Sequence, residues 1–567
     1  MSNALRKEDI PGDDLEFYNR ISPVLNGVSY PVPAPKEDNF DLRKQHRLAF
    51  RNQRILYRRT CDFSGQEILS NYSPKKHFPV YGRKVWWTEA CKPISYGREF
   101  DFGSPFFEQF AKLQRVVPMP SLIINNCENS EFNNNIDNSR NCYLSFGVEE
   151  CFDSLYITDS FNLRDCLDAW GVKNSENCYH TYRGGKLFNC KYTERCSGSS
   201  DLLFCRMCTD CHHCFGCMLI NHKQYCIFNK QYTKEQYFEF IDSLNLGSHK
   251  EVQDQYLAAQ NFFATCPMSP NGREFVEECT WGDLVYHAKN CHACFTIDHA
   301  EDCKYMFEVS NAQRSQDIDC CNDVMGLSYQ VVASKNFFNL FFSYNCRSSS
   351  DSYYLMDCTQ VKHCFGCVGL YNKEYCILNK QFSKEDYFEL LPKIISHLQE
   401  TGEWGEFFPT ELSRFGYNET DARLYYPLRR DIAIREGFRW NDYRNEPEIE
   451  SLLAPEVIPD HISDVSDDIC KQTLMCEVSG RVYKITSKEL SYYRSHDIPI
   501  PRRHPEQRFR DFLAIRNPMW MNKRQCHAVY RKDGKEVRCQ EMIDSAWPLD
   551  SPQKVFCTPC YYKWIYT

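Results

Sequence analysis

The residues with the clearest chemical potential are closely spaced cysteines in the middle of the chain. The stretch "CRMCTDCHHCFGC" holds five cysteines from Cys205 to Cys217, each three residues after the last. Cys-x-x-Cys is the spacing with which thiolates hold a metal ion, so the run could be a metal site. The alternative is that the thiols are buried as small hydrophobic side chains.

A second copy of this region bears on that choice. "HCFGCMLINHKQYCIFNKQYTKEQYFEF" from His213 matches "HCFGCVGLYNKEYCILNKQFSKEDYFEL" from His363. Two of the five cysteines are replaced in the second copy, by Leu355 and Val361, which cannot bind a metal. The comparison therefore favours burial for the run. The metal interpretation stays open at the cysteines that both copies keep, which are Cys214, Cys217, Cys226, Cys364, Cys367 and Cys376.

These cysteines belong to a longer pattern with a period of three. Thirteen cysteines from Cys127 to Cys226 share one reading frame, and nearly every other residue of that frame is small or aliphatic. The residue before each frame position is very often Asn, Asp or Gly, which tolerate tight turns. A strict period of three fits neither a helix nor an ordinary strand. The pattern predicts a β-solenoid with short sides, whose frame residues point inward.

Two further features set the expected size and number of these units. Aliphatic residues recur at Ile157, Val172 and Leu187, which predicts a coil of about fifteen residues. The triplet pattern returns from 279 to 327, slips by one residue, and continues from 328 to 370. The expected fold class is therefore mainly β: a duplicated cysteine-rich β-solenoid in triplet register, with helical caps, flanked by zinc-ribbon-like ends.

Four cysteines near the C-terminus predict a different kind of site. Cys557-x-x-Cys560, with Cys526 and Cys539 upstream, offers four thiolates at zinc-ribbon spacing. The first pair is spread over thirteen residues, and His527 could replace one thiolate. We predict a zinc site at these four cysteines. The alternative is that they are scattered buried thiols.

The N-terminal region resembles a decayed copy of this segment. "RNQRILYRRTC", ending at Cys61, aligns with "RNPMWMNKRQC", ending at Cys526. The remaining three ligand positions are then occupied by Ser64, Gly82 and Val85, so no zinc is expected there. "CDFSG" at Cys61 recurs as "CEVSG" at Cys476, which indicates a third knuckle that has lost its second cysteine.

A basic segment lies beside each end. Residues 43–59 contain seven Lys or Arg and no acid, and four arginines would share one face of a helix. Such a stripe beside a zinc ribbon suits a phosphate backbone. Ion pairs with the protein's own carboxylates, or a solvated face, are the alternatives. The candidate nucleic-acid residues are Arg47, Arg51, Arg54 and Arg58, with Arg516 beside the C-terminal cysteines.

Composition bounds the remaining interpretations. The 567 residues carry a net charge of −9, so nucleic-acid contact would depend on local basic patches. No apolar run approaches a membrane span, and "MSNALRKEDIPGDD" lacks the apolar core of a signal peptide. We expect a cytoplasmic protein without a membrane partner, in which most of the 33 cysteines are reduced.

The expected organisation has seven parts. They are an N-terminal arm and basic helix (1–60), a degenerate zinc-ribbon-like segment (61–115), solenoid copy 1 (120–230), a helical connector (231–262), solenoid copy 2 (263–380), a capping helix and aromatic strap (381–450), and the C-terminal zinc-ribbon region (451–567).

Three motifs carry a resemblance to known sequences. "HCFGC...KxYCIxNKQ", "GEWGEFFP...FGYNET" and "VFCTPCYYKWIY" resemble a group of cysteine-rich zinc-ribbon repeat proteins of uncultivated small-genome bacteria and large DNA viruses. The resemblance spans nearly the whole chain. It implies that the C-terminal ribbon binds metal, and it implies no activity.

Three functional classes follow from the sequence. The favoured one is a non-enzymatic zinc-binding scaffold or binding protein that contacts a nucleic acid or a nucleoprotein. A carbohydrate-active β-helix enzyme would need a cluster of carboxylates, for which Asp153, Asp165 and Asp168 are candidates in turn positions. A cysteine redox or metal-storage protein would need exposed thiols of low pKa. No catalytic residues stand out.

Overall fold

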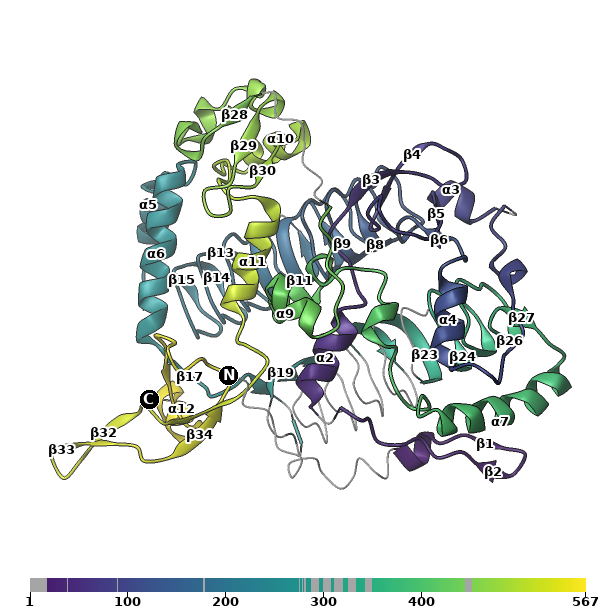
Figure 1. The fold of residues 1–567 in the computed structure, drawn as a ribbon. Helices are drawn as coiled ribbons and strands as arrows, with labels where there is room; N and C mark the ends of the chain where they lie inside the picture. The colour runs from purple at the N-terminus through teal and green to yellow at the C-terminus, as the bar shows by residue number, and fades with distance from the viewer. Residues whose placement is uncertain are drawn as a thin grey trace.

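Helices and strands are present in nearly equal amounts. The structure is a computed structural model, in which 27% of the chain is helical and 26% is strand (Figure 1). It describes residues 18–566, apart from 38, 89, 177–178, 275, 278, 280–281, 287–294, 299–306, 311–319, 325–332, 342–348 and 444–450.

The predicted fold class is therefore wrong. The chain is mixed α/β, its strands are divided among several sheets, and no closed solenoid is found in the described residues. The physical reason is that the triplet pattern covers only the cysteine-rich segments. Amphipathic segments before, between and after them fold into helices, which the prediction reduced to caps.

Two groups of parallel strands form the centre of the molecule. The first stack, residues 124–227, has two runs of parallel strands: β7 (Ile124–Asn125), β8 (Asn134–Asp137), β9 (Phe146–Glu149), β10 (Phe161–Arg164), β11 (Leu167–Glu176) and β12 (Tyr179–Gly185), and then β13 (Ser200–Leu203), β14 (His212–Phe215) and β15 (Gln224–Ile227). A short strand after the stack, β16 (Lys230–Gln231), pairs antiparallel with β15. The second stack, residues 273–377, belongs to a ten-stranded sheet: β18 (Arg273–Glu274), β19 (Asp283–Tyr286), β20 (Phe295–Asp298), β21 (Phe307–Ser310), β22 (Cys320–Val324), β23 (Ala333–Phe341), β24 (Ser350–Tyr353), β25 (Lys362–Phe365), β26 (Glu374–Ile377) and β27 (Lys380–Gln381).

The other elements surround the two stacks. The helices are α2 (Phe40–Leu48), α3 (Arg83–Trp86), α4 (Phe106–Gln114), α5 (Lys234–Asp242), α6 (His249–Thr265), α7 (Lys384–Glu400), α8 (Ala422–Tyr425), α9 (Arg430–Arg435), α10 (Ser487–Ser495), α11 (Pro505–Ile515) and α12 (Thr558–Ile565), with short 3-10 turns at Pro93–Tyr96, Thr410–Leu412, Tyr417–Glu419, Pro455–Val457, Ile462–Asp464 and Asp467–Lys471. The remaining strands are β1 (Val24–Leu25), β2 (Val28–Ser29), β3 (Tyr57–Thr60), β4 (Glu67–Ser70), β5 (Val80–Tyr81), β6 (Met119–Pro120), β17 (Pro267–Met268), β28 (Leu452–Leu453), β29 (Thr473–Met475), β30 (Val482–Tyr483), β31 (Asn522–Gln525), β32 (Val529–Lys532), β33 (Lys535–Arg538), β34 (Met542–Ser545) and β35 (Lys554–Val555).

Neighbouring strands of the first stack pair twelve residues apart. Ile124 pairs with Ile136 and Cys214 with Cys226, and the Asn126 side chain bonds Asn138 at the same separation of 12. The predicted coil of fifteen residues is therefore wrong. Twelve and fifteen are both multiples of three, so the triplet frame alone could not separate them.

Burial in the first stack follows the triplet frame. One buried cluster contains Ile136, Val148, Cys166, Val172 and many other frame residues. Most residues just before a frame position have positive φ, as at Asn138 (48°) and Asp165 (52°), which Asn, Asp and Gly adopt at low cost. The predicted inward frame and its turn residues are confirmed here. Most of the second frame lies outside the described residues.

The frame slip predicted in the second half has a counterpart in the strand register. Arg273 pairs with Val285, twelve residues on, whereas Cys320 pairs with Ala333. One extra residue therefore enters between β22 and β23. After it, Phe338 pairs with Ser350, so the step of twelve returns.

Small polar side chains of the frame satisfy the backbone inside the first stack. Cys208 Sγ lies 3.5 Å from the carbonyl oxygens of Arg206 and Cys217, to which its thiol donates. The Ser154 hydroxyl donates to Phe152 O and accepts from the N–H of Cys166. Buried carbonyls need donors, and Cys, Ser and the amide of Asn133 provide them at frame positions.

A helix follows the last strands of each stack, as the sequence predicted. Thr233 caps α5, with its side chain and that of Gln236 forming a capping box. Ser383 caps α7 by accepting the N–H of Asp386. Tyr237 of α5 and Tyr387 of α7 are buried against the ends of the stacks.

Candidate metal centre

The four C-terminal cysteines belong to one compact unit of hairpins and a helix. Strand β31 pairs antiparallel with β34, and the β32–β33 hairpin projects from the unit at the lower left of Figure 1. Cys526 follows β31, and Cys539 follows β33. Cys557 caps the N-terminus of α12, and Cys560 lies in its first turn. We call residues 522–565 the C-terminal hairpin–helix module.

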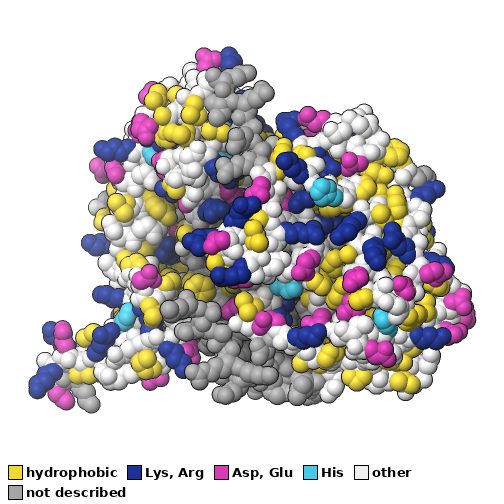
Figure 2. Space-filling view, in the orientation of Figure 1, with side chains coloured by type: hydrophobic (Ala, Val, Ile, Leu, Met, Phe, Trp, Pro, Cys, Tyr) yellow, Lys and Arg dark blue, Asp and Glu magenta, His cyan; other side chains and the backbone are white. Residues whose placement is uncertain are grey.

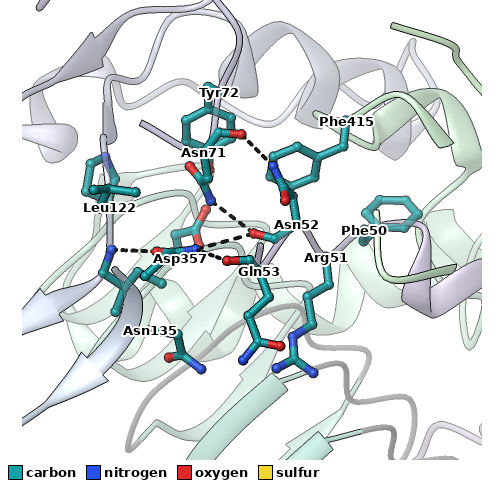
Figure 3. A pocket seen from close by; sticks show the side chains of 13 residues that line it. Phe50, Arg51, Asn52, Gln53, Asn71, Tyr72, Leu122, Asn135, Asp357 and Phe415 are labelled. Atoms are coloured by element: carbon teal, nitrogen blue, oxygen red, sulfur yellow. Dashed lines mark hydrogen bonds between the residues drawn. The ribbon is translucent and has the colours of Figure 1, made fainter. Parts of the chain in front are cut away.

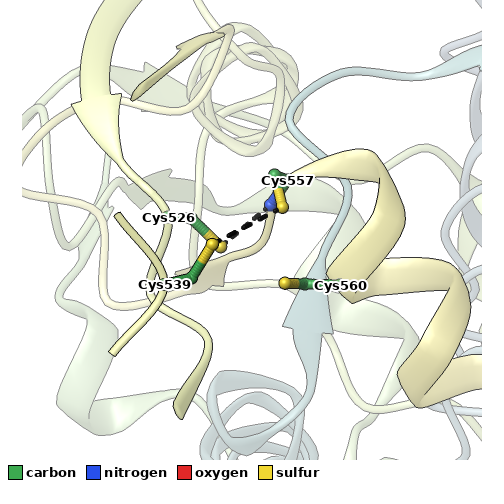
Figure 4. A group of neighbouring side chains, drawn as sticks. All are labelled: Cys526, Cys539, Cys557 and Cys560. Atoms are coloured by element: carbon green, nitrogen blue, oxygen red, sulfur yellow. Dashed lines mark hydrogen bonds between the residues drawn. The ribbon is translucent and has the colours of Figure 1, made fainter. Parts of the chain in front are cut away.

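The four thiols converge on a common centre (Figure 4). Their Sγ atoms all lie within 4.8 Å of one another, and those of Cys539 and Cys557 are 3.9 Å apart. A tetrahedral ion with bonds of about 2.3 Å to sulfur requires sulfurs about 3.8 Å apart. The arrangement therefore fits a metal ion, and its four protein ligands would leave no open position for a substrate.

Backbone N–H groups support the thiolate form of these cysteines. The N–H groups of Cys557 and Ala528 donate to Cys526 Sγ, over 3.1 and 3.4 Å. Burial raises the pKa of Cys526, whereas the backbone N–H of Glu541 lowers that of Cys539. A bound cation would lower both pKa values, because the thiolate is the ligand form.

His527 has a structural role beside the cluster. Its ring Nδ1 accepts the backbone N–H of Val555 over 3.2 Å, and the backbone N–H of His527 donates to Val555 O over 2.9 Å. The ring thereby holds β35 against the turn that follows β31. The alternative in which His527 replaces a thiolate is not supported, because the converging group consists of the four cysteines.

The module is fastened to the segment that leads into the second stack. Strand β35 pairs in parallel with β17, through Pro267 with Lys554 and Met268 with Val555. The N–H of Ala546 and the hydroxyl of Ser545 both donate to Pro270 O. A metal at the four thiols would therefore stabilise the junction between this module and the second stack.

Residues 57–86 form a counterpart of this module near the N-terminus. Strands β3 and β4 pair antiparallel, and the Gly82 N–H donates to Cys61 Sγ over 3.3 Å, as the Cys557 N–H donates to Cys526 Sγ. Asp62 repeats both hydrogen bonds of His527: its N–H donates to Val80 O, and its Oδ2 accepts the N–H of Val80. Strand β5 pairs in parallel with β6, which leads into the first stack.

These matches confirm the alignment made from the sequence. Cys61 lies at the position of Cys526, and Gly82 caps α3 where Cys557 caps α12. Burial would raise the pKa of Cys61, but the Ser64 hydroxyl and the backbone N–H of Gly82 outweigh it and lower that pKa. Cys61 therefore sits in a thiolate-supporting turn without the other three ligands.

A third module of the same kind spans residues 473–513. Cys476 receives the N–H of Ser479 over 3.5 Å, and the backbone N–H of His504, the N-cap of α11, also bonds its thiol and lowers its pKa against the effect of burial. The third knuckle at Cys476 is thus present. Sequence reasoning missed His504 at the position of Cys557, although "CEVSG" marked where the module begins.

The cysteines of the "CFGC" segments do not form a metal cluster. Cys214, Cys217 and Cys226 are buried in the first stack, and Cys364, Cys367 and Cys376 in the second. In the part of the chain that the structure describes, the C-terminal group is the one set of three or more ligand side chains close enough to share an ion. His213 and His363 stack on Tyr225 and Tyr375.

Two buried thiols of the first stack, Cys142 and Cys151, are poorly suited to redox chemistry. Burial raises the pKa of Cys142 and Cys151 to about 12, so both are protonated at neutral pH. The reactive form of cysteine is the thiolate. Cys142 and Cys151 therefore act as packing and hydrogen-bonding side chains.

The predicted basic helix is shorter than expected and does not carry the stripe. Helix α2 ends at Leu48, because the Asn52 side chain, bonded to the N–H and carbonyl of Ile55, turns the chain toward β3. Arg47 lies in the last turn of α2, and the other three arginines lie beyond the helix. The expectation of one helical face over residues 43–59 was wrong.

The candidate arginines contact the protein itself. Their partners are Asp421 for Arg51 at 3.2 Å, Glu506 for Arg54 at 3.4 Å, and Glu67 for Arg58 at 2.7 Å, while Arg47 is buried and Arg516 lies over the rings of Trp170 and Tyr425. Figure 2 shows Lys and Arg mixed with Asp and Glu on one face. A nucleic-acid contact is unsupported at these residues.

The three candidate acids of the carbohydrate-active alternative lie in different environments. Asp168 is buried and ion-paired with Arg508, and burial raises its pKa to about 6 despite that partner. Asp153 and Asp165 lie at turn positions with φ near 53° and 52°. Asp168 therefore cannot reach a sugar without movement of α11.

A small pocket lies where the N-terminal segment meets the first stack (Figure 3). Some of its polar side chains bond the backbone. Asn52 Nδ2 donates to Asn71 O, and Asn134 Nδ2 donates to Gln53 O over 3.2 Å. The pocket thus marks where residues 50–72 are fixed to the stack.

No family model, curated protein or solved structure matches the chain. Among the described residues, no helix combines the length and the apolar character needed to cross a membrane.

Proposed function

We propose that this protein is a non-enzymatic scaffold or binding protein whose C-terminal hairpin–helix module is held by one structural zinc ion. The observation that carries the proposal is the convergence of Cys526, Cys539, Cys557 and Cys560, whose sulfurs lie within 4.8 Å of one another. This is the geometry and chemistry of a closed thiolate site.

The structural role of the ion follows from what the four thiols join. Cys526 follows β31, Cys539 follows the projecting hairpin, and the remaining pair begins α12. The buried cluster immediately around the four thiols is small, with Cys526, Ala528 and Cys557 at its centre. Zinc would therefore provide the cross-link that a small core cannot.

The experiment is a measurement of metal in protein purified without chelator. We expect about one zinc per chain, and none in the variant Cys557→Ser/Cys560→Ser. Iron in place of zinc would give visible absorption and would change the metal assignment. Unchanged zinc in the double variant would overturn the site.

The chain offers a matched control for this experiment. Cys61 and Cys476 occupy the position of Cys526 in the two other modules, and neither module has the other three cysteines. The variant Cys61→Ser/Cys476→Ser should therefore keep its zinc. Loss of zinc there as well would indicate unfolding rather than removal of ligands.

The nucleic-acid partner and the resemblance to small-genome and viral cysteine-rich proteins stay predictions of the sequence. Arg51 and Arg54 are paired with buried carboxylates, so the nucleic-acid prediction does not support the proposal. The resemblance implies no activity. The scaffold proposal depends on the modules and stacks alone.

A further inference from the structure

A buried group of charged side chains lies where the third module, residues 473–513, meets the first stack. Arg508 of α11 pairs with Asp168 of β11, and its Nη2 lies 3.8 Å from Oε1 of Glu489 in α10. Arg508, Asp168 and Glu489 are 6%, 3% and 0% exposed, so bulk water stabilises none of these charges. Neither the metal site nor the cysteine packing uses this group.

Aromatic side chains surround the charged group. Phe509 and Phe512 of α11 form one buried cluster with Trp170 of β11, and the rings of Phe509 and Trp170 are 5.6 Å apart. The guanidinium of Arg508 lies 4.5 Å from the ring centre of Tyr156. Figure 1 shows α11 lying across the strands of the first stack. Separation of the third module from the stack would therefore expose the charges to water.

The three charges do not balance. Arg508 carries one positive charge, whereas Asp168 and Glu489 carry one negative charge each when both are ionised. A buried charge without a partner is costly, and a carboxylate removes that cost by binding a proton. Burial accordingly raises the pKa of both Asp168 and Glu489. The group therefore favours the uptake of a proton while the module is docked.

Hydrogen bonds indicate which carboxylate receives the proton. Glu489 accepts hydrogen bonds from the hydroxyls of Tyr156 and Tyr493, over 2.8 and 2.7 Å, and such bonds favour its ionised form. In the part of the chain that the structure describes, Arg508 is the one side chain that hydrogen-bonds the carboxylate of Asp168. Protonation therefore costs fewer hydrogen bonds at Asp168 than at Glu489.

Other titratable groups face these two carboxylates from the neighbouring elements. They are Tyr143, Tyr156, Tyr179 and Tyr192 of the first stack, Tyr483 and Tyr493 of the third module, and Arg54 of the segment after α2. Burial raises the pKa of all six tyrosines, so they stay neutral at pH 7. The tyrosines therefore do not titrate in the range where the carboxylates do.

A second charged group lies beside the first. It consists of Glu506 and the three arginines that pair with it, Arg54, Arg423 and Arg510. Its net positive charge favours the ionised form of Asp168. Burial is nevertheless the largest influence on the pKa of Asp168 and raises it to about 6, although its own ion pair and Arg54 lower it.

We propose that Asp168 is a proton-binding switch, which holds the third module on the first stack when protonated and loosens it on ionisation. In the open state water solvates Asp168, so the docked state binds the proton more tightly. Docking therefore weakens as pH rises from about 4 to about 6. The switch makes access to the part of the first stack beneath α11 depend on pH.

The test measures hydrogen exchange in the full-length protein between pH 4.5 and 7, corrected for the intrinsic exchange rate at each pH. We expect the protection of α10 and α11 to fall about tenfold or more over this range, relative to α7 on the second stack. Helix α12, which begins at the metal site, reports any loss of metal separately. Unchanged relative protection of α10 and α11 would overturn the proposal.

The variant Asp168→Asn keeps the size and one acceptor oxygen of the side chain but cannot ionise. It should retain at pH 7 the protection of α10 and α11 that the parent shows at pH 4.5. Equal loss of protection at both pH values would show that Asp168 is an ion-pair partner of Arg508 and no switch.

Asp153→Asn is the matched control. Asp153 occupies the same kind of turn as Asp168, with φ of 53° against 51°, but its side chain is 43% exposed. This variant should keep the pH dependence of the parent. If it loses that dependence as well, the dependence does not originate at Asp168 and the proposal is wrong.

Discussion

Gly82 donates its backbone N–H to Cys61 Sγ over 3.3 Å, and a Cβ atom added at Gly82 would lie 3.9 Å from that sulfur. The backbone at Gly82 matches that at Cys557, so the N-terminal module retains the shape of a metal site after the ligands have been lost.

The first prediction is that this dormant site can be restored. The variant Ser64→Cys/Gly82→Cys/Val85→Cys should bind one more zinc per chain than the parent, because Cys61 and its N–H donors are already in place. The measurement is metal content together with a cobalt titration, in which tetrahedral thiolate coordination gives visible absorption. The same substitutions with Cys61→Ser should not gain the ion.

One steric contact bears on that prediction. The added Cβ at Gly82 would approach Ile68 Cγ2 to 3.2 Å, so this side chain must move by a few tenths of an ångström. A folded triple variant that binds no additional metal would show that the resemblance between the modules is confined to the backbone.

The second prediction concerns the cysteines of the first stack. Cys211 donates its thiol to Thr209 O and Ile220 O, and the second copy has buried Val361 at the same place. We expect Cys211→Val to cost less than about 1.5 kcal/mol, and Cys211→Asp to cost about 3 kcal/mol or more, because a buried carboxylate lacks partners there. Thermal unfolding midpoints give the comparison.

A conservative variant completes this test. Cys211→Ser keeps one donor for these carbonyls and should fall between the other two variants. Equal destabilisation by Val and Asp would show that the thiol contributes through a specific interaction, such as binding, rather than through packing.

The third prediction concerns acid stability. Burial would raise the pKa of Glu506, but Arg423 at 2.5 Å and Arg54 at 3.4 Å outweigh it and lower that pKa to about 2. A carboxylate with a depressed pKa stabilises the fold at neutral pH, and this contribution is lost as pH falls from about 4.5 toward 2. The contribution at neutral pH is about 3 kcal/mol.

Glu506→Gln should therefore lower the thermal midpoint at pH 7 and reduce its dependence on pH between about 4.5 and 2. The measurement is a set of thermal melts across that range for both proteins. Asp468→Asn, which removes an exposed carboxylate paired with Lys471, is the surface control. Parallel curves for the parent and Glu506→Gln would contradict the prediction.

The fourth prediction concerns the arginines expected to bind nucleic acid. Arg51 and Arg54 are largely buried, and each pairs with a carboxylate of a distant segment, so Arg51→Glu and Arg54→Glu should lower the thermal midpoint. Arg58→Glu, at an exposed pair with Glu67, should have little effect. Fluorescence anisotropy with mixed RNA or DNA over a salt series measures the binding itself.

We expect that any binding of RNA or DNA does not weaken steeply with salt through contacts made by these three arginines. Binding that weakens steeply with salt, and that a folded Arg58→Glu variant reduces, would restore the phosphate interpretation for this segment.

Much of the local structure could be predicted from residue type and spacing. The triplet frame predicted which side chains of the first stack point inward, because each turn residue needs positive φ and each frame residue must fit a narrow interior. The four C-terminal cysteines, and the counterparts of the module at Cys61 and Cys476, were also found from short motifs.

The remainder depended on contacts between residues far apart in the chain. The spacing of Arg51 and Arg54 suggests a helix, but their partners, Asp421 and Glu506, lie hundreds of positions away and cannot be inferred from that spacing. The fold class was wrong for a related reason. The prediction followed the repeat, whereas the helices around it are stabilised by packing on surfaces that are distant in sequence.

The step of twelve residues between strands of the first stack has a consequence for how the chain folds. Each strand pairs with a neighbour close in sequence, so the stack can grow one repeat at a time with little loop-closure entropy at each step. The link between Arg54 and Glu506 instead closes a separation of 452 residues. Fast local growth of the stack should therefore precede a slow stage in which the two ends of the chain meet across it.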